Sequence, residues 1–299
     1  MKISFLLYDA HGTDGTVRAT ANLAGALADQ HDVEIVSCHR TADRMRLTPA
    51  PGVKVRTLVD LRPASRHYPG RIGDQRARGT MCPHDTVHHG PTPPGTLGEE
   101  RLARFLRDTD ADVVIATRPY LTCFLAEYGR PDQLRIGQEH TGRDLHPAAL
   151  RDDLDRAVSL LDAYVSVSAA DARAHRRALH SARTRLTSIP ACSPAPRTEP
   201  SSGQSRTVVT AGRLTAPERY DRLVDAFAKV VAVHPDWTLR IYGRGPERGR
   251  LRRRIDELGL HDHVLLMGAR TPMDLEWAKA PSPSCRAAPD PPACPSWRP

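Results

Sequence analysis

Short apolar segments and amphipathic segments alternate along the first 190 residues of this 299-residue chain. The apolar segments are five to seven residues long and often β-branched, which is typical of strands buried in a parallel sheet. Six of them predict strands, at residues 3–9, 32–38, 53–59, 112–117, 134–138 and 163–168. Amphipathic periodicity predicts helices at about 16–30, 99–108 and 147–161. This order predicts a doubly wound α/β domain that binds ligands at the carboxyl ends of its strands.

The alternation of apolar and amphipathic segments is interrupted twice and resumes after each interruption. Residues 62–98, rich in Pro, Gly, His and Arg, predict an irregular surface insertion, and residues 191–206 have the composition of an interdomain linker. A second alternating set follows, with strands at 207–211, 238–243 and 264–268 and helices at about 218–234, 246–259 and 273–280. We therefore expect two Rossmann-type domains facing a cleft, at 1–190 and 207–280.

The final segment, 281–299, contains seven prolines and no aliphatic side chain larger than alanine. Neither a strand nor a helix can be built from it, so we expect a disordered tail and an incomplete second domain.

The formal net charge of +8 raises the question of a polyanionic partner. Only four of the 43 basic residues are lysines, which points to the codon bias of a GC-rich genome. The four phenylalanines are not interleaved with basic residues as a stacking platform for bases requires, so we expect no nucleic-acid partner. No run approaches the roughly 18 apolar residues of a membrane span, and we expect a cytoplasmic protein.

A group of metal-ligating residue types lies within "MCPHDTVHHG", where Cys82, His84, His88 and His89 fall close together. Zinc uses such ligands. The flanking segments are loop-like, however, and no second ligand pair follows, so a solvated loop without a metal ion is the preferred interpretation.

The stretch "VVTAGRLTAPERYDRLVDAF" leads from a strand through one glycine and one arginine into an amphipathic helix. It places Arg213 at the carboxyl edge of the second sheet, near a helix amino end. Backbone N–H groups there favour an anion, and a guanidinium can bind phosphate oxygens in a forked contact. A diphosphate fits this arrangement. Pairing of Arg213 with a surface carboxylate is the alternative.

A nicotinamide-binding fold is disfavoured by the first loop. Such a fold has G-x-G-x-x-G after its first strand and an acidic residue at the end of its second. Here Gly12 and Gly15 form G-x-x-G, and the second strand ends in "SCHR".

Taken together, the motifs resemble those of the retaining GT-B glycosyltransferases of family 4, also called glycosyl transferase group 1. The resemblance covers about residues 1–280 and is carried by "AGRLTAPERYDRLVDAFAKV", "PDWTLRIYGRGPERGRLRRRIDELGL" and "HVLLMGA". In the first half, "YDAHGTDGTVRATANLAGALA" resembles the family's glycine-rich loop and helix, and "IGQEHTGRD" resembles the segment with its active-site histidine.

For the second domain, this resemblance implies that Arg213 binds the diphosphate of a nucleotide-sugar donor. The family's usual lysine five positions later is Glu218 here, so Arg219 is the candidate for the second cation. If Arg219 lies on the helix, its side chain is rotated by about 100° from that position. Gly243 and Gly245 would form the turn beside the nucleotide base.

For the first domain, the resemblance implies that Gly12 and Gly15 let the backbone approach the phosphates, and that His140 faces the donor sugar. The alternatives are a turn that needs a positive φ at Gly12 and a histidine that only caps a strand end. Glu139 would point away from His140 on a strand, so the two are not paired as acid and base.

The implied reaction transfers a sugar from a nucleotide-diphosphate sugar to the hydroxyl of an unknown acceptor, with retention and without a metal ion or other cofactor. Peripheral membrane association is conceivable, but no specific motif supports it. The family's two glutamates after "MDLEWAKA" are absent. We therefore expect a truncated or frameshifted end with weak or no transfer, and a remnant that binds nucleotide or sugar without turnover is the alternative.

Overall fold

The computed structural model describes residues 1–12, 14–69, 82, 84–85, 95–180, 182–191, 198–199, 201, 203–270 and 273–280. Its chain divides into two compact units, Met1–Ser193 (unit 1) and Pro194–Pro289 (unit 2). The division falls within the segment where the composition predicts a linker. The expected tail at 281–299 lies outside the described residues.

Unit 1 contains a seven-stranded sheet in which every neighbouring pair is parallel, with the order β3-β2-β1-β4-β5-β6-β7. Its strands are β1 (Lys2–Asp9), β2 (Asp32–Arg40), β3 (Lys54–Asp60), β4 (Val113–Ala116), β5 (Leu134–Glu139), β6 (Ala163–Ser166) and β7 (Arg185–Ser188). The strand order reverses between β1 and β4. In doubly wound sheets, ligands bind outside the carboxyl ends of the strands at such a reversal.

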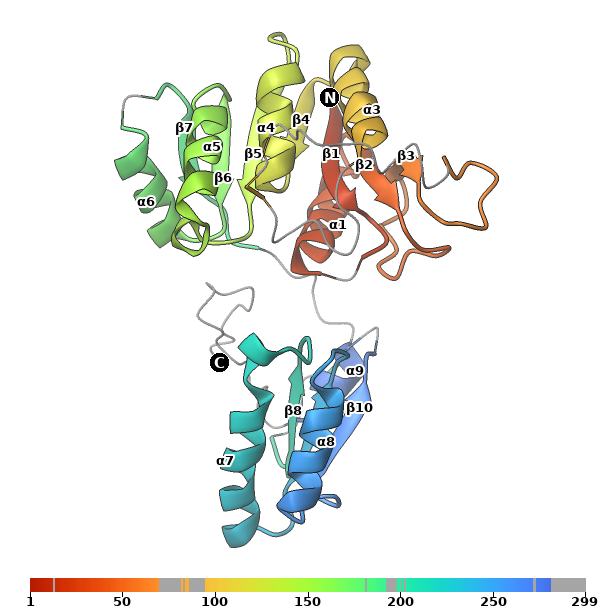
Figure 1. Cartoon of the computed structure of the whole chain (residues 1–299), viewed down its shortest axis with the longest axis vertical. Helices are drawn as coiled ribbons and strands as arrows, with labels where there is room; N and C mark the ends of the chain where they lie inside the picture. Colours follow the sequence, from red (N-terminus) through yellow and green to blue (C-terminus); the bar gives the residue numbers. More distant parts are fainter. Residues whose placement is uncertain are drawn as a thin grey trace. The chain divides into compact units, whose positions relative to one another are not determined.

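Side chains of β1 alternate between two cores, one on each face of the sheet. Phe5 and Leu7 pack with α1, whereas Leu6 packs on the opposite face, which α3, α4 and α5 cover (Figure 1). The helices of unit 1 are α1 (Gly15–Leu27), α3 (Thr96–Asp108), α4 (Pro119–Tyr128), α5 (Ala148–Val158) and α6 (Ala169–Ala178). Burial of both faces explains why the central strand β4 is apolar throughout.

Unit 2 contains a parallel three-stranded sheet with the order β10-β9-β8. Its elements are β8 (Thr207–Ala211), α7 (Tyr220–Val233), β9 (Thr238–Tyr242), α8 (Arg248–Glu257), β10 (Val264–Gly268) and α9 (Asp274–Trp277). Helices α7 and α8 lie side by side on one face of the sheet, where Phe227 and Leu251 contribute to the core (Figure 1). Trp277 of α9 packs on the other face, against Tyr242.

The structure adds two α-helices, α4 and α6, and one strand, β7, that the periodicity did not indicate. It also corrects the predicted insertion at 62–98. Helix α3 begins at Thr96, and two of the described residues in that segment are fully buried, Cys82 in the core of unit 1 and Asp85 beside α4. For these residues the expectation of a solvated loop is wrong. Among the described residues, no helix is both long enough and apolar enough to span a bilayer.

Candidate functional site

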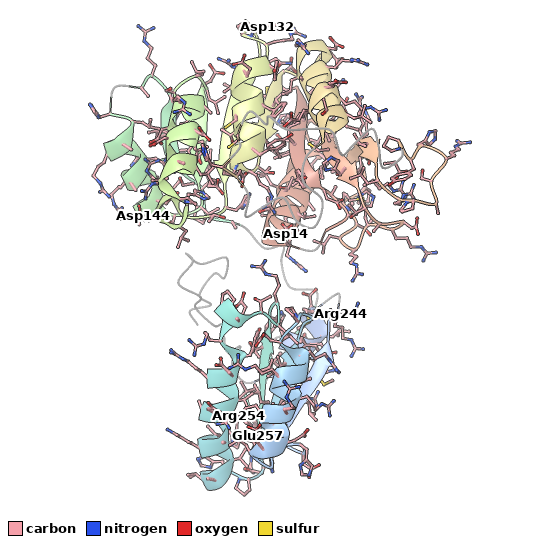
Figure 2. All side chains as sticks on the ribbon, viewed as in Figure 1. Asp14, Asp132, Asp144, Arg244, Arg254 and Glu257 are labelled. Atoms are coloured by element: carbon pink, nitrogen blue, oxygen red, sulfur yellow. The ribbon has the colours of Figure 1, made fainter. Side chains whose placement is uncertain are left out.

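Two arginines follow the strands of unit 2 at the carboxyl edge of its sheet. Arg213 comes two residues after β8, and Arg244 comes two residues after β9. Both are exposed, and no described residue forms a hydrogen bond or ion pair with either guanidinium. Figure 2 shows Arg244 at this edge, while Arg254 lies farther along α8. As far as the described residues go, the carboxyl edge of unit 2 therefore presents two unpaired cations that can bind an anion.

Backbone hydrogen bonds join the loops that carry these arginines. The amide of Gly212 donates to the carbonyl of Tyr242 at 3.0 Å, and the amide of Leu214 donates to the carbonyl of Arg244 at 2.9 Å. A methyl group on Gly243 would lie 1.9 Å from the Gly212 carbonyl oxygen, and one on Gly245 would lie 2.2 Å from the Leu214 oxygen. The contact between the loops thus already demands both glycines, whether or not a nucleotide base lies beside them.

Arg219 does not lie on the regular helix where the sequence had placed it. Residues Ala216–Glu218 form a 3-10 turn, α7 begins at Tyr220, and Arg219 between them is left-handed, with φ 49° and ψ 39°. The expected rotation around a helix therefore does not apply. The Arg219 guanidinium donates to Asp221 at 3.2 Å. Arg219 must release Asp221, or contact Asp221 and a phosphate at the same time, before it can act as a second phosphate-binding cation.

A surface pocket of about 300 Å³ lies where α7 and α8 begin. Two arginines that line it are paired with carboxylates, Arg219 with Asp221 and Arg250 with Glu247 at 3.3 Å. Arg213 is not among its lining residues. The structure therefore does not bring the two arginines predicted to bind the diphosphate, Arg213 and Arg219, into this pocket.

In unit 1, the loops after β1 and β4 meet at the reversal of the strand order. Asp14 caps α1 by accepting the amide of Val17 at 3.0 Å, and Arg118, just after β4, donates to Asp14 at 3.2 Å. A methyl group on Gly15 would meet nothing within 4 Å, and neither Gly12 nor Gly15 has a positive φ. The alternative reading of Gly12 as a turn glycine with positive φ is therefore wrong.

His140 follows β5 at the same edge of unit 1. Burial lowers its pKa, an effect that the charge of Glu139 opposes and that of Arg118 reinforces. A neutral imidazole is the form that these surroundings favour. Its Nε2 atom is buried and has no hydrogen-bond partner among the described residues. An orphaned buried nitrogen of this kind can bind a hydroxyl group of a ligand.

The side chain of Glu139 contacts the backbone after β5 and not the imidazole of His140. Its Oε1 accepts the amides of His140 and Thr141, both at 2.9 Å, and its Oε2 lies 3.6 Å from Nε2 of His146. Burial opposes the ionised carboxylate, but the partnership with His146 and these hydrogen bonds hold its pKa below the usual range. Burial likewise opposes charge on His146, yet Glu139, Asp85 and Asp171 raise its pKa. The pair is thus a buried ion pair.

We expect the stabilisation from this ion pair to be greatest between about pH 4.5 and 6.5, the ordinary values for Glu and His. Because the pKa of Glu139 is lowered on folding, its contribution is present above pH 4.5 and lost as the pH falls through the folded value. Because the pKa of His146 is raised, its contribution is present below pH 6.5 and lost as the pH rises through the folded value. Urea unfolding of the native protein and Glu139→Gln, measured from well below pH 4.5 to well above pH 6.5, checks the expectation. A difference between them that does not change with pH would contradict it.

The predicted metal-ligand cluster is only partly described, because His88 and His89 lie outside the described residues. His84 Nδ1 lies 2.7 Å from a carboxylate oxygen of Asp153, and Cys82 is buried in the core. Within the described part of the chain, no group of three or more His, Cys, Asp or Glu residues is arranged to hold a metal ion.

Residues 195–277 match the family model of glycosyl transferases group 1. The matched segment includes both exposed arginines at the carboxyl edge of unit 2. Over 287 residues, or 94% of this chain, the sequence is 34% identical to an exopolysaccharide phosphotransferase of Streptomyces coelicolor. Over 61 residues, or 20% of this chain, it is 44% identical to the GtfA subunit of a UDP-N-acetylglucosamine–peptide N-acetylglucosaminyltransferase of Streptococcus gordonii. The chain spans only 30% and 12% of the lengths of these relatives.

The fold is similar to that of a TarM mutant from S. aureus, whose structure contains α-GlcNAc-glycerol and UDP. The TM-score is 0.66 at 10% sequence identity, over 93% of this chain and 79% of that one. At this identity the likeness concerns the fold, which is the α/β fold with parallel sheets of GT-B glycosyltransferases.

Reasoning from sequence missed three residues at these edges: Arg118, Arg244 and His146. A signal for Arg244 was present, since "AGR" after β8 and "YGR" after β9 place a Gly-Arg pair at the same point of two neighbouring strands. Arg118 also follows a strand, in "ATRP". Nothing local marks His146, because its partner Glu139 becomes visible only in the fold.

Proposed function

We propose that this chain binds a nucleotide-diphosphate sugar and transfers its sugar to an acceptor hydroxyl with retention at the anomeric carbon. The supporting observation is the carboxyl edge of unit 2. There Arg213 and Arg244 are exposed without described partners, inside the segment that matches glycosyl transferases group 1. Guanidinium groups bind phosphate oxygens through paired, charge-assisted hydrogen bonds.

In the proposed reaction, the bond between the anomeric carbon and the diphosphate breaks, and the nucleoside diphosphate leaves with the electron pair. A new bond forms from that carbon to the acceptor oxygen, whose hydroxyl proton is released. Arginine cations stabilise the negative charge on the leaving diphosphate, so we propose that no metal ion is required. His140, with its neutral imidazole and buried Nε2, positions a hydroxyl of the donor sugar. We also propose that the protein is located in the cytoplasm.

Replacing Arg213 by alanine is expected to weaken the binding of UDP-, GDP- or ADP-glucose by about tenfold or more. This corresponds to the loss of one charge-assisted contact of roughly 1.5–3 kcal/mol. Isothermal titration calorimetry measures the change. Arg252→Ala is the matched control, because it removes the same charge from an exposed arginine on α8. Equal losses in the two variants would show only a nonspecific charge effect and would contradict the assignment of Arg213.

The name of the Streptomyces coelicolor relative raises phosphoryl transfer as a second candidate. The two reactions leave different products from one donor. Glycosyl transfer releases the nucleoside diphosphate, whereas transfer of the sugar with its phosphate cleaves the phosphoanhydride and releases the nucleoside monophosphate. Chromatography of the products from UDP-glucose separates the two. Binding without either product would identify the non-catalytic remnant.

A further inference from the structure

Glu139 holds the backbone at the point where β5 ends. The residue is 3% exposed and its strand pairs with β6 up to Glu139 itself. The next two amides, those of His140 and Thr141, both donate to its Oε1 at 2.9 Å. A buried carboxylate that accepts two successive backbone amides fixes the direction in which the chain leaves the strand.

His146 in turn holds the other oxygen of this carboxylate. It is 4% exposed, follows the 3-10 turn Arg143–Leu145, and places Nε2 3.6 Å from Oε2 of Glu139. Asp171 fixes the start of the same turn, because its Oδ1 accepts the amide of Arg143 at 2.7 Å. The segment from residue 139 to 146 is therefore held at both ends by the carboxylate of Glu139 and near its middle by that of Asp171.

We propose that Glu139 and His146 are positioning residues for His140, holding its side chain in place at the carboxyl edge of unit 1. This inference rests on the proposed function in one respect, namely that His140 contacts the donor sugar. The position of the imidazole itself does not depend on that function. Neither Glu139 nor His146 touches the reacting atoms in this proposal.

The first measurement needs no ligand. Glu139→Gln keeps the shape of the side chain but removes its charge, and His146→Gln removes the partner. We expect the NMR signals of the His140 ring to shift or broaden in both variants, with the assignment made from His140→Gln. Glu127→Gln, which neutralises an exposed glutamate on α4, should leave them unchanged. Unaltered His140 signals in both test variants, with the fold intact, would overturn the inference.

The second measurement separates positioning from a merely structural role. With UDP-glucose as the probe and UDP release as the readout, we expect kcat to fall about tenfold in each variant, while KM changes less than twofold. The double variant should be no slower than the slower single variant, because both residues serve one purpose. A wild-type chain that neither binds nor turns over a nucleotide sugar would remove the proposed function, and the NMR comparison would still decide whether His140 is positioned by this pair.

Discussion

Replacing Gly243 by alanine is expected to destabilise unit 2 by at least about 3 kcal/mol, because a Cβ atom cannot fit between the two loops of its carboxyl edge. The added methyl group would lie 1.9 Å from the carbonyl oxygen of Gly212. That oxygen belongs to backbone and cannot swing away as a flexible side chain can. The loops must separate, and the hydrogen bond from Gly212 to Tyr242 weakens with them.

Urea unfolding followed by tryptophan fluorescence tests this result. Trp237 and Trp277 are partly buried and pack against the cores of unit 2, and the described part of unit 1 contains no tryptophan, so the signal follows unit 2. Trp297, which lies outside the described residues, is replaced by phenylalanine in every protein compared.

Gly249→Ala is the matched control for the same change of side chain. Gly249 lies on α8, and the nearest atom to its added Cβ would be Nη1 of Arg253 at 3.9 Å. Alanine there should stabilise unit 2 by up to about 1 kcal/mol, since glycine is the poorer helix former. Opposite signs for the two variants support the packing argument. A Gly243→Ala protein as stable as the native one would refute it.

The outcome also distinguishes a glycine that the fold requires from one that it does not require, at the carboxyl edge of a sheet. Gly243 and Gly245 are required by the fold, so their presence is weak support for a nearby nucleotide. Gly15 has open space around its Cβ position and an ordinary φ, so the fold does not require it. A role of Gly15 in binding a ligand stays a prediction.

The strands were predictable because a parallel sheet covered on both faces imposes a local signature. Every residue of β4 is buried, and its sequence is correspondingly apolar. Helix α4 escaped prediction for a related reason, since seven of its ten residues are buried and no polar stripe reveals a helical period. Strand β7, "RLTS", lies at the edge of its sheet, where half-buried polar residues resemble a loop.

The sequence could predict the position of a candidate residue only where that residue follows a recognisable strand. Arg213 and His140 could be placed at carboxyl edges because each follows a recognisable strand. The environment of each side chain could not be predicted, because it depends on partners that only folding brings close. Asp221 engages Arg219, and Glu139 holds the backbone of His140 through contacts that no spacing rule indicates.

Asp85 is the clearest case of a residue whose importance the sequence concealed. It lies in a segment rich in Pro, Gly and His, yet its side chain is fully buried and its Oδ2 accepts the amide of Tyr120 at 3.0 Å. Helix α4 has Pro119 in its first turn and no cap from the side chain of Arg118. The carboxylate of Asp85 therefore caps this helix from 35 residues away, and its charge also raises the pKa of His146.

Replacing Asp85 by alanine should accordingly destabilise unit 1 by about 2–3 kcal/mol. The buried amide of Tyr120 loses its acceptor, and the amino end of α4 loses a favourable negative charge. His84→Ala is the control, because His84 is a neighbour whose side chain is 49% exposed, and its pair with Asp153 should contribute less than about 1 kcal/mol.

Hydrogen exchange measured by mass spectrometry localises the effect. Amides in the first turn of α4 should exchange faster in Asp85→Ala than in His84→Ala, while α7 in unit 2 is unchanged in both. Because the charge of Asp85 raises the pKa of His146, Asp85→Ala should lower the pKa of that imidazole in an NMR titration. If α4 exchanges at the native rate without Asp85, the buried carboxylate does not cap this helix.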